Sequence, residues 1–238
     1  MGIIPNHFFT FNGFNSKDFG VWISGSGTYG APSWDVEEVS IPGRNGTLHI
    51  DKGRLNNISI TYPAFIPRHW PVKWAGFKNA MLHDSGFHRL EDTYHPDFFR
   101  LASYVGPLEP EVTAANLSGA FDISFICRPE RWLKDGERLR AITSGTVLMN
   151  PTGYTAKPLI RVVGSGAISF GGVYWMGVNS ETDYIDIDCE LMDAFCGSTN
   201  CNRNIGVPDG FPVLDSGETR VNYTGFTSVQ IAPRWWTV

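Results

Sequence analysis

Three acidic residues have a spacing that could support chemistry. Asp186, Asp188 and Glu190 occupy every second position of the segment 184–191, with apolar residues between them. Carboxylates in a group can bind a divalent cation or serve as acid and base in glycoside hydrolysis. In a strand, however, this alternation puts the three acids on one face and the apolar residues on the other. We therefore expect a solvent-exposed acidic face that orients a basic partner, not a metal or catalytic site.

Histidines close to acidic residues form a second candidate group. His83, His88 and His95 are flanked by aspartate and glutamate, a combination that can bind metal or transfer protons. Their spacing matches no ligand pattern, and the segment spans the end of a predicted helix and the strand after it. The dipole of a helix C-terminus is enough to explain His83. We expect no catalytic or metal-binding role for the three.

The four cysteines contain no C-x-x-C pair, and every histidine lies at or before His95. A zinc finger built from the cysteine cluster in the second half is therefore excluded. A disulfide between Cys196 and Cys201 is conceivable, but free thiols are expected in a cytosolic product. The cysteines are Cys127, Cys189, Cys196 and Cys201.

Other catalytic and ligand-binding motifs are absent from the sequence. The chain has no G-x-S-x-G nucleophile motif, and its loop from Gly25 to Gly30 lacks the Gly-Lys-Ser/Thr end of a phosphate-binding loop. Four aromatic residues of the second half could stack on sugar rings, although such residues more often pack in cores or interfaces; they are Tyr174, Trp175, Trp235 and Trp236. We predict no catalytic, cofactor-binding or metal-binding residues.

The composition is that of a globular protein. The chain has 238 residues, of which 42% are hydrophobic and 18% charged, enough for one large or two small domains. Its 26 glycines and 15 prolines, with many β-branched and aromatic residues, favour an all-β class. A net charge of -5 without a basic run argues against nucleic-acid binding.

No membrane attachment is predicted. The N-terminus lacks a charged region followed by an apolar one, and no apolar stretch approaches the length of a membrane span. Gly2 is suited to myristoylation, but Asn6 stands where Ser or Thr is required. We expect the protein to be made and kept in a cytosol.

The segment from Ile41 to Asn57 predicts hairpins. Asn45-Gly46 suits a two-residue turn because both central positions need positive φ. A second turn is expected near Lys52-Gly53, followed by an alternating strand over 58–62. The predicted turn residues are Gly43, Asn45, Gly46 and Gly53, and their role is structural.

One helix is predicted, over 71–83, because Pro71 suits a first helical position and Asp84-Ser85-Gly86 suits an end. The clearest strands are predicted at 121–127, 157–163, 168–174, 184–191 and 227–231. Residues 133–145 are expected to connect two domains, and 193–208 to form a polar loop.

With these elements placed, the chain resembles the distal tail protein (Dit) family of long-tailed bacteriophages over nearly its whole length. The resemblance rests on the order and spacing of several short motifs: Phe11-Asn12-Gly13, Ser16-Lys17-Asp18-Phe19-Gly20-Val21, Ile41-Pro42-Gly43-Arg44-Asn45-Gly46, Asp51-Lys52-Gly53-Arg54, Arg89-Leu90-Glu91-Asp92, Tyr94-His95-Pro96-Asp97-Phe98-Phe99, Phe125-Ile126-Cys127-Arg128-Pro129, Asn150-Pro151-Thr152, Lys157-Pro158-Leu159-Ile160, the 184–190 segment and Pro233-Arg234-Trp235.

The resemblance implies a mainly β protein with one helix in its N-terminal domain. A ring-forming domain is expected over 1–135 and a galectin-like β-sandwich over 146–227. Residues 228–238 either close the second domain or return to the first. The implied protein is a non-enzymatic homohexameric hub at the tail tip of the virion, assembled in the host cytoplasm.

The implied partners are the major tail tube protein, a tail-associated fibre or lysin protein and, in many members, receptor-binding proteins, with no nucleic-acid contact beyond the lumen and no membrane. In such a ring the hairpin from Ile41 to Asn57 is itself a candidate interface. The alternative function is a carbohydrate-binding module that contacts host wall sugars through the second domain. Galectins use a histidine-containing motif for sugar, and this half of the chain has no histidine.

Overall fold

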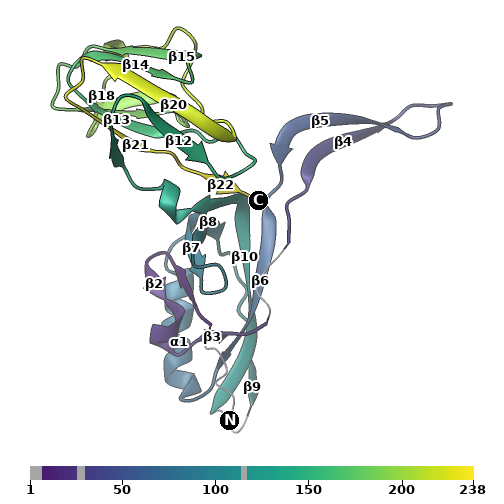
Figure 1. Cartoon of the computed structure of the whole chain (residues 1–238). Helices are drawn as coiled ribbons and strands as arrows, with labels where there is room; N and C mark the ends of the chain where they lie inside the picture. The colour runs from purple at the N-terminus through teal and green to yellow at the C-terminus, as the bar shows by residue number, and fades with distance from the viewer. Residues whose placement is uncertain (1–6, 26–29, 114–116) are drawn as a thin grey trace. The chain divides into compact units, whose positions relative to one another are not determined.

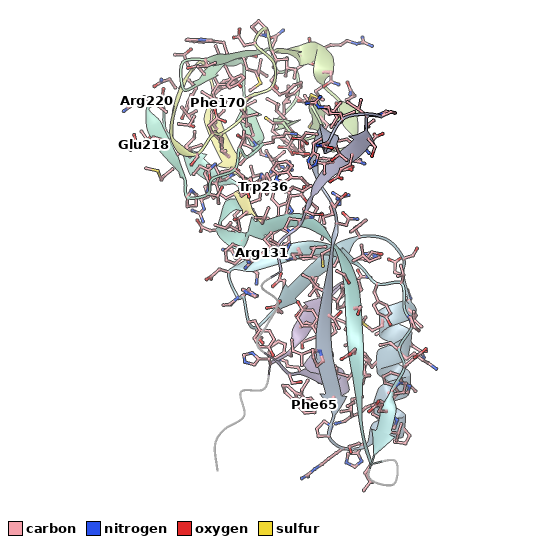
Figure 2. The ribbon with its side chains drawn as sticks, turned by 90° about the vertical axis from the view of Figure 1, so that its right-hand side faces the viewer. Phe65, Arg131, Phe170, Glu218, Arg220 and Trp236 are labelled. Atoms are coloured by element: carbon pink, nitrogen blue, oxygen red, sulfur yellow. The ribbon has the colours of Figure 1, made fainter. Side chains whose placement is uncertain are left out.

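The computed structural model describes residues 7–25, 30–113 and 117–238. The chain forms two compact units, Met1–Arg131 with Val238, and Trp132–Thr237. The boundary falls inside one long strand, β10 (Ser118–Leu133), next to Arg131, which is labelled in Figure 2. The N-terminal myristoylation pattern and the loop residues Ser26 and Gly27 lie outside the described residues.

The first unit is built on a large antiparallel sheet in the strand order β2-β1-β7-β8-β10-β6-β3, with β9 paired to β10 (Figure 1). Its strands are β1 (Phe9–Phe11), β2 (Phe14–Asn15), β3 (Trp22–Ile23), β6 (Ile58–Ile66), β7 (His88–Asp92), β8 (Phe98–Ser103) and β9 (Glu111–Thr113), besides β10. A short 3-10 helix covers Ser16–Phe19. In β10, side chains alternate between buried and exposed, as expected when one face of a sheet covers a core.

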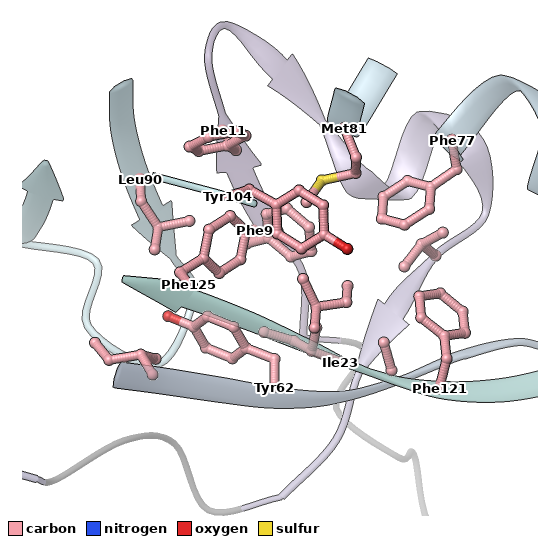
Figure 3. Close-up of a cluster of buried hydrophobic side chains, with 14 of the residues drawn as sticks. Phe9, Phe11, Ile23, Tyr62, Phe77, Met81, Leu90, Tyr104, Phe121 and Phe125 are labelled. Atoms are coloured by element: carbon pink, nitrogen blue, oxygen red, sulfur yellow. The ribbon is translucent and has the colours of Figure 1, made fainter. Parts of the chain in front are cut away.

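The helix α1 (Trp70–Leu82) packs on the buried face of this sheet. Trp70, Trp74, Phe77 and Met81 follow one another at intervals of four and three residues, which places them on one side of the helix. Phe77 and Met81 are almost fully buried, and they meet the rings of the strands in an aromatic-rich core (Figure 3). This contact between helix and sheet supplies the hydrophobic core of the first unit.

Two strands of the first unit stand apart from this sheet. β4 (Trp34–Ser40) and β5 (Thr47–Leu55) pair only with each other in a two-stranded sheet. Figure 1 shows them as a long hairpin that extends away from α1 and β9. Almost all of its residues are exposed.

The second unit is a β-sandwich, because one buried cluster draws side chains from both of its sheets. The six-stranded sheet has the order β11-β21-β13-β16-β17-β18. Its members are β11 (Arg140–Ile142), β13 (Leu159–Val163), β16 (Ile185–Asp188), β17 (Asp193–Cys196), β18 (Thr199–Asn200) and β21 (Ser228–Ala232).

The other sheet of the sandwich has five strands in the order β12-β20-β14-β15-β19. They are β12 (Thr146–Asn150), β14 (Gly166–Phe170), β15 (Tyr174–Val178), β19 (Ile205–Gly206) and β20 (Gly217–Thr224). Short 3-10 helices cover Lys134–Gly136 and Asn202–Asn204. The last strand, β22 (Trp236–Thr237), pairs with β10, and the amide of Leu133 donates to the carbonyl of Trp235 at 2.9 Å.

The mainly β class with one α-helix is confirmed for the described residues, and the helix lies within one residue of its predicted bounds. Three local predictions are wrong. The predicted connector 133–145 contains β11, the predicted loop 193–208 contains β17, β18 and β19, and the predicted strand 168–174 spans the turn at Gly171-Gly172. The stretch 228–238, for which two placements were left open, divides between them: β21 lies in the six-stranded sheet of the second unit, whereas β22 pairs with β10 and Val238 belongs to the first unit.

Candidate assembly surface

The loop of the β4–β5 hairpin is longer than the sequence predicts. Ser40 pairs with Thr47, which leaves six residues between the strands. The predicted two-residue turn at Asn45-Gly46 is therefore wrong. Gly46 does have positive φ, 83°, but as a bend just before β5.

The tight turn of this loop lies earlier, at Pro42-Gly43. The amide of Arg44 donates to the carbonyl of Ile41 at 3.2 Å, and Gly43 has a φ of 79°. Proline followed by a residue with positive φ is typical of a type II turn, which needs glycine at its second central position. Gly43 is thus the predicted turn residue on which the tight turn depends.

The second predicted turn, near Lys52-Gly53, is also wrong because β5 continues to Leu55. Gly53 instead occupies a bulge, where one residue of β4, Asp35, faces the three residues Lys52–Arg54 of β5. Its φ is 67°, and its amide donates to a carboxylate oxygen of Asp51 at 2.8 Å. Bulges of this kind use glycine and increase the local twist of a hairpin.

One face of the hairpin carries an uncovered apolar patch. Val39 pairs with Leu48, and Ile50, which pairs with Glu37, follows on the same face. Their exposed fractions are 36%, 48% and 45%, although each would be buried in an ordinary sheet. The other face carries the pair of Glu38 with His49, whose Oε1 and Nε2 are 3.2 Å apart. A two-stranded ribbon with one free apolar face is typical of a surface that binds another protein.

The base of the hairpin is held by charged side chains. Arg54 donates from Nε and Nη2 to Oδ2 of Asp35 at 2.7 Å, and Lys52 Nζ lies 3.5 Å from Oδ1. Hydrogen bonding from Arg54, with the positive charge of Lys52, holds the pKa of Asp35 below its usual value against the effect of burial. These contacts join the two strands across the bulge.

The predicted acidic face of the second unit is wrong for two of its three residues. Asp186 and Asp188 are only 5% and 6% exposed, whereas Glu190 lies beyond the end of β16 and is exposed. The alternation of the sequence is real, but both faces of β16 are covered. The alternation of residue types along a strand carries no information on what covers its second face.

Each buried carboxylate has an arginine partner. Arg161 donates from Nε and Nη2 to the two oxygens of Asp186 at 2.6 and 2.7 Å. Arg234 donates from Nη1 and Nη2 to those of Asp188, both at 2.8 Å. Paired, bidentate carboxylates of this kind have a structural role, and their oxygens are occupied.

Asp188 also caps the turn after β16. Its Oδ1 accepts hydrogen bonds from the amides of Glu190 and Leu191 at 3.0 and 3.1 Å. Burial would raise the pKa of Asp188, but the hydrogen bonds from Arg234 and from these amides hold it below its usual value. Arg161 and Arg234 thus have a structural role, because they neutralise the two buried carboxylates. In the sequence only Arg234 was part of a recognised motif, Pro233-Arg234-Trp235, and no motif identified Arg161.

The histidines do not converge on a site. His88 lies 3.6 Å from Asp84 and His95 lies 3.4 Å from Asp92, each within its own local turn. His83 ends the helix α1. Among the described residues no group of three His, Cys, Asp or Glu side chains is placed to bind a metal ion.

All four cysteines are free thiols. Burial raises the pKa of Cys127 and of Cys189 to about 12. A thiol with so high a pKa is almost fully protonated at neutral pH and is a poor nucleophile. Neither of these cysteines is therefore suited to covalent catalysis.

The four aromatic residues of the second half differ in exposure. Trp235 is buried, and Trp236 is half-buried, with its indole N–H donating to the carbonyl of Thr155 at 3.0 Å. Tyr174 packs against the core of the sandwich. Trp175 is 54% exposed and is the one member of the group that solvent reaches freely.

In the described part of the chain, no helix is both long enough and apolar enough to cross a membrane.

Comparisons of sequence alone identify no relatives. No family model matches the chain, and no curated protein matches it significantly. Solved structures do match. The Dit protein (gp 19.1) of phage SPP1, a hub of the adsorption apparatus in phages that infect Gram-positive bacteria, aligns with a TM-score of 0.74 at 13% identity, over 98% of this chain and 99% of its own.

Two structures of the phage p2 baseplate in its activated conformation, with strontium and with calcium, align with a TM-score of 0.52 each, at 11% and 10% identity. Each match covers 94% of this chain and 96% of the baseplate chain. The fold is therefore that of a phage tail hub component. In particular, the whole chain has the fold of a Dit protein, which confirms the fold implied by the sequence motifs.

Proposed function

We propose that the chain is a structural hub protein of a phage tail tip. The observation that carries the proposal is the match to SPP1 Dit, which runs through both units and leaves almost no residue of either chain unmatched. Because the match covers both units, it is not explained by a chance similarity between two β-sandwich domains. The role proposed is assembly, not catalysis.

In this proposal six copies form a closed ring through their first units. The ring connects the tail tube protein to a tail-associated fibre or lysin protein and carries receptor-binding proteins, and it belongs to the virion. A ring requires that one patch of each subunit meets a different patch on its neighbour. The apolar face of the β4–β5 hairpin supports this, because Val39, Leu48 and Ile50 form a free patch next to unpaired strand edges.

The test replaces two apolar residues of that face. Leu48→Ser with Ile50→Ser removes the apolar patch but leaves the pairing of the strands intact. The matched control, Glu38→Ser with His49→Ser, changes two residues of the opposite face at the same level of the hairpin. Native mass spectrometry and negative-stain microscopy report the oligomeric state.

We expect six-fold rings for the unchanged protein and for the control, and monomers for the apolar-face variant with an unchanged circular dichroism spectrum. Assembly of the apolar-face variant into the same rings would show that the hairpin is not the interface. A protein that stays monomeric at high concentration, and that purified tails do not incorporate, would contradict the hub itself.

A further inference from the structure

The outer face of the five-stranded sheet in the second unit has a hollow of about 430 Å³. It is lined by Val147, Gly171, Gly172, Glu218, Arg220 and Asn222. Figure 2 shows Glu218 and Arg220 at the outer margin of this unit, whereas Phe170 lies inside the sandwich. The two glycines leave the floor open because a Cβ at either position would meet no atom within 4 Å.

An exposed tryptophan lies on the same sheet face. Asn222 of β20 pairs with Ser169 of β14, and Ser169 pairs with Trp175 of β15. Residues that face one another across neighbouring strands share a sheet face. Trp175, Ser169 and Asn222 therefore form a row across three strands, at the side of the hollow, about 10 Å long at the usual strand spacing.

The polar side chains that line the hollow are free to bind. Neither Glu218 nor the amide of Asn222 has a hydrogen bond within the described residues, and the guanidinium of Arg220 makes only a long one, 3.3 Å, to the carbonyl of Gly145. Ser169, which lies between Asn222 and Trp175 in the row, is 3% exposed.

We propose that this face is a binding site for a neutral carbohydrate, with Trp175 as its stacking platform. A flat indole face offers apolar contact to the C–H face of a pyranose ring, and the row has the width of one or two such rings. Adjacent hydroxyls of a sugar can donate to Glu218 and accept from Arg220, while the Asn222 amide does both.

The charge of the site selects a neutral ligand. Glu218 and Arg220 lie two residues apart on one strand, and their opposite charges cancel. The hollow therefore favours neither an anion nor a cation. The hollow is shallow and solvent-exposed, so the affinity expected is low, with a Kd on the order of 1 mM. The site lies wholly within the second unit and does not depend on ring formation.

Saturation-transfer NMR of the full-length protein tests the proposal, because it detects binding in this range. The probes are glucose, galactose, N-acetylglucosamine, rhamnose and maltose, with galacturonate and an acidic and a basic peptide as other ligand classes. The variants are Trp175→Ala, Trp175→Phe and Asn222→Ala. The matched control is Trp34→Ala, since Trp34 of β4 is exposed to a similar extent, 57% against 54%.

We expect transfer to at least one neutral sugar, reduced at least 10-fold in Trp175→Ala and Asn222→Ala, partly kept in Trp175→Phe and unchanged in Trp34→Ala. Thermal unfolding of each variant checks its fold, and native mass spectrometry reports any loss of assembly separately. No transfer to any sugar, equal transfer in Trp175→Ala, or transfer only to galacturonate or a peptide would each overturn the proposal.

Discussion

Asp188 shows how one buried carboxylate organises its surroundings. It accepts two hydrogen bonds from Arg234 and two from the backbone of the turn after β16. Through these four contacts it connects the closing segment of the chain to a turn near position 190. Its position in the sequence is that of an ordinary polar residue in an alternating strand. Its effect on stability therefore follows from its partners.

We predict that Asp188→Asn lowers the free energy of unfolding at pH 7 by about 3 kcal/mol, because it leaves the Arg234 guanidinium without its counter-charge. Urea denaturation of the wild type and the variant measures this difference in the free energy of unfolding. The matched control is Glu190→Gln, which removes an exposed pair with Lys157 at 3.4 Å and should cost about 0.5 kcal/mol or less.

The pH dependence of that difference has a defined sign. The folded pKa of Asp188 is lowered, so its stabilisation is fully present above the unfolded pKa of about 3.9 and is lost as pH falls through the folded pKa. The gap between wild type and Asp188→Asn should therefore persist at pH 5 to 8 and narrow below about pH 4. A gap that does not change with acidification would contradict the ion pair.

Thiol reactivity is a second prediction at the scale of single residues. Cys196 is partly exposed, whereas Cys201 is buried and burial raises the pKa of Cys127 and Cys189 to about 12. A disulfide reagent such as DTNB should therefore label Cys196 alone in the native protein and all four thiols after denaturation. Cys196→Ser should remove the native reaction. Rapid labelling that survives this substitution would show that a buried cysteine is accessible.

Among the elements, α1 depends on a narrow stripe of side chains. Phe77 is fully buried, whereas Val72, five residues earlier on the same helix, is 80% exposed. The apolar residues of the helix therefore do not contribute equally, and only the stripe of Trp70, Trp74, Phe77 and Met81 faces the sheet.

We predict that Phe77→Ala costs about 3–5 kcal/mol of stability, through lost burial and the cavity left behind. Val72→Ala, the matched control on the solvent side, should change stability by about 0.5 kcal/mol or less. Chemical denaturation with a fluorescence readout compares the two. Similar losses for both variants would mean that α1 packs on a different face.

At the scale of the whole molecule, each unit has its own hydrophobic core. In each unit one glycine lies so close to a neighbouring residue that a Cβ at its position would clash. A Cβ on Gly119 would lie 2.5 Å from a ring carbon of Trp70 in the first unit, and one on Gly166 would lie 2.1 Å from the carbonyl oxygen of Thr224 in the second. Both contacts are far shorter than van der Waals separation.

We predict that Gly119→Ala and Gly166→Ala each destabilise by about 1–3 kcal/mol through overpacking. Hydrogen exchange followed by mass spectrometry should find the loss of protection in residues 30–131 for Gly119→Ala and in 132–237 for Gly166→Ala. Loss spread evenly over both ranges in both variants would mean that the two cores unfold as one.

Local sequence signals are sufficient to predict the mainly β class, the one α-helix of the described residues and, through the order of short motifs, the Dit fold. These features depend on local signals, namely the alternation of apolar and polar residues, glycine and proline at turns, and short motifs that can be recognised without knowledge of tertiary contacts. The sequence-based predictions were wrong where tertiary contacts determine the local structure. Lys52-Gly53 has the composition of a turn but forms a bulge, since β4 holds β5 in register on both sides of it.

Which strand faces are covered is evident only from the folded chain. Asp186 and Asp188 alternate like solvent-facing residues, yet Arg161 and Arg234 from distant positions cover and neutralise them. Val39, Leu48 and Ile50 alternate like core residues, yet nothing in the described chain covers them. Periodicity reports that a strand has two faces. What lies against each face depends on segments far away in the sequence, and only the folded chain brings those together.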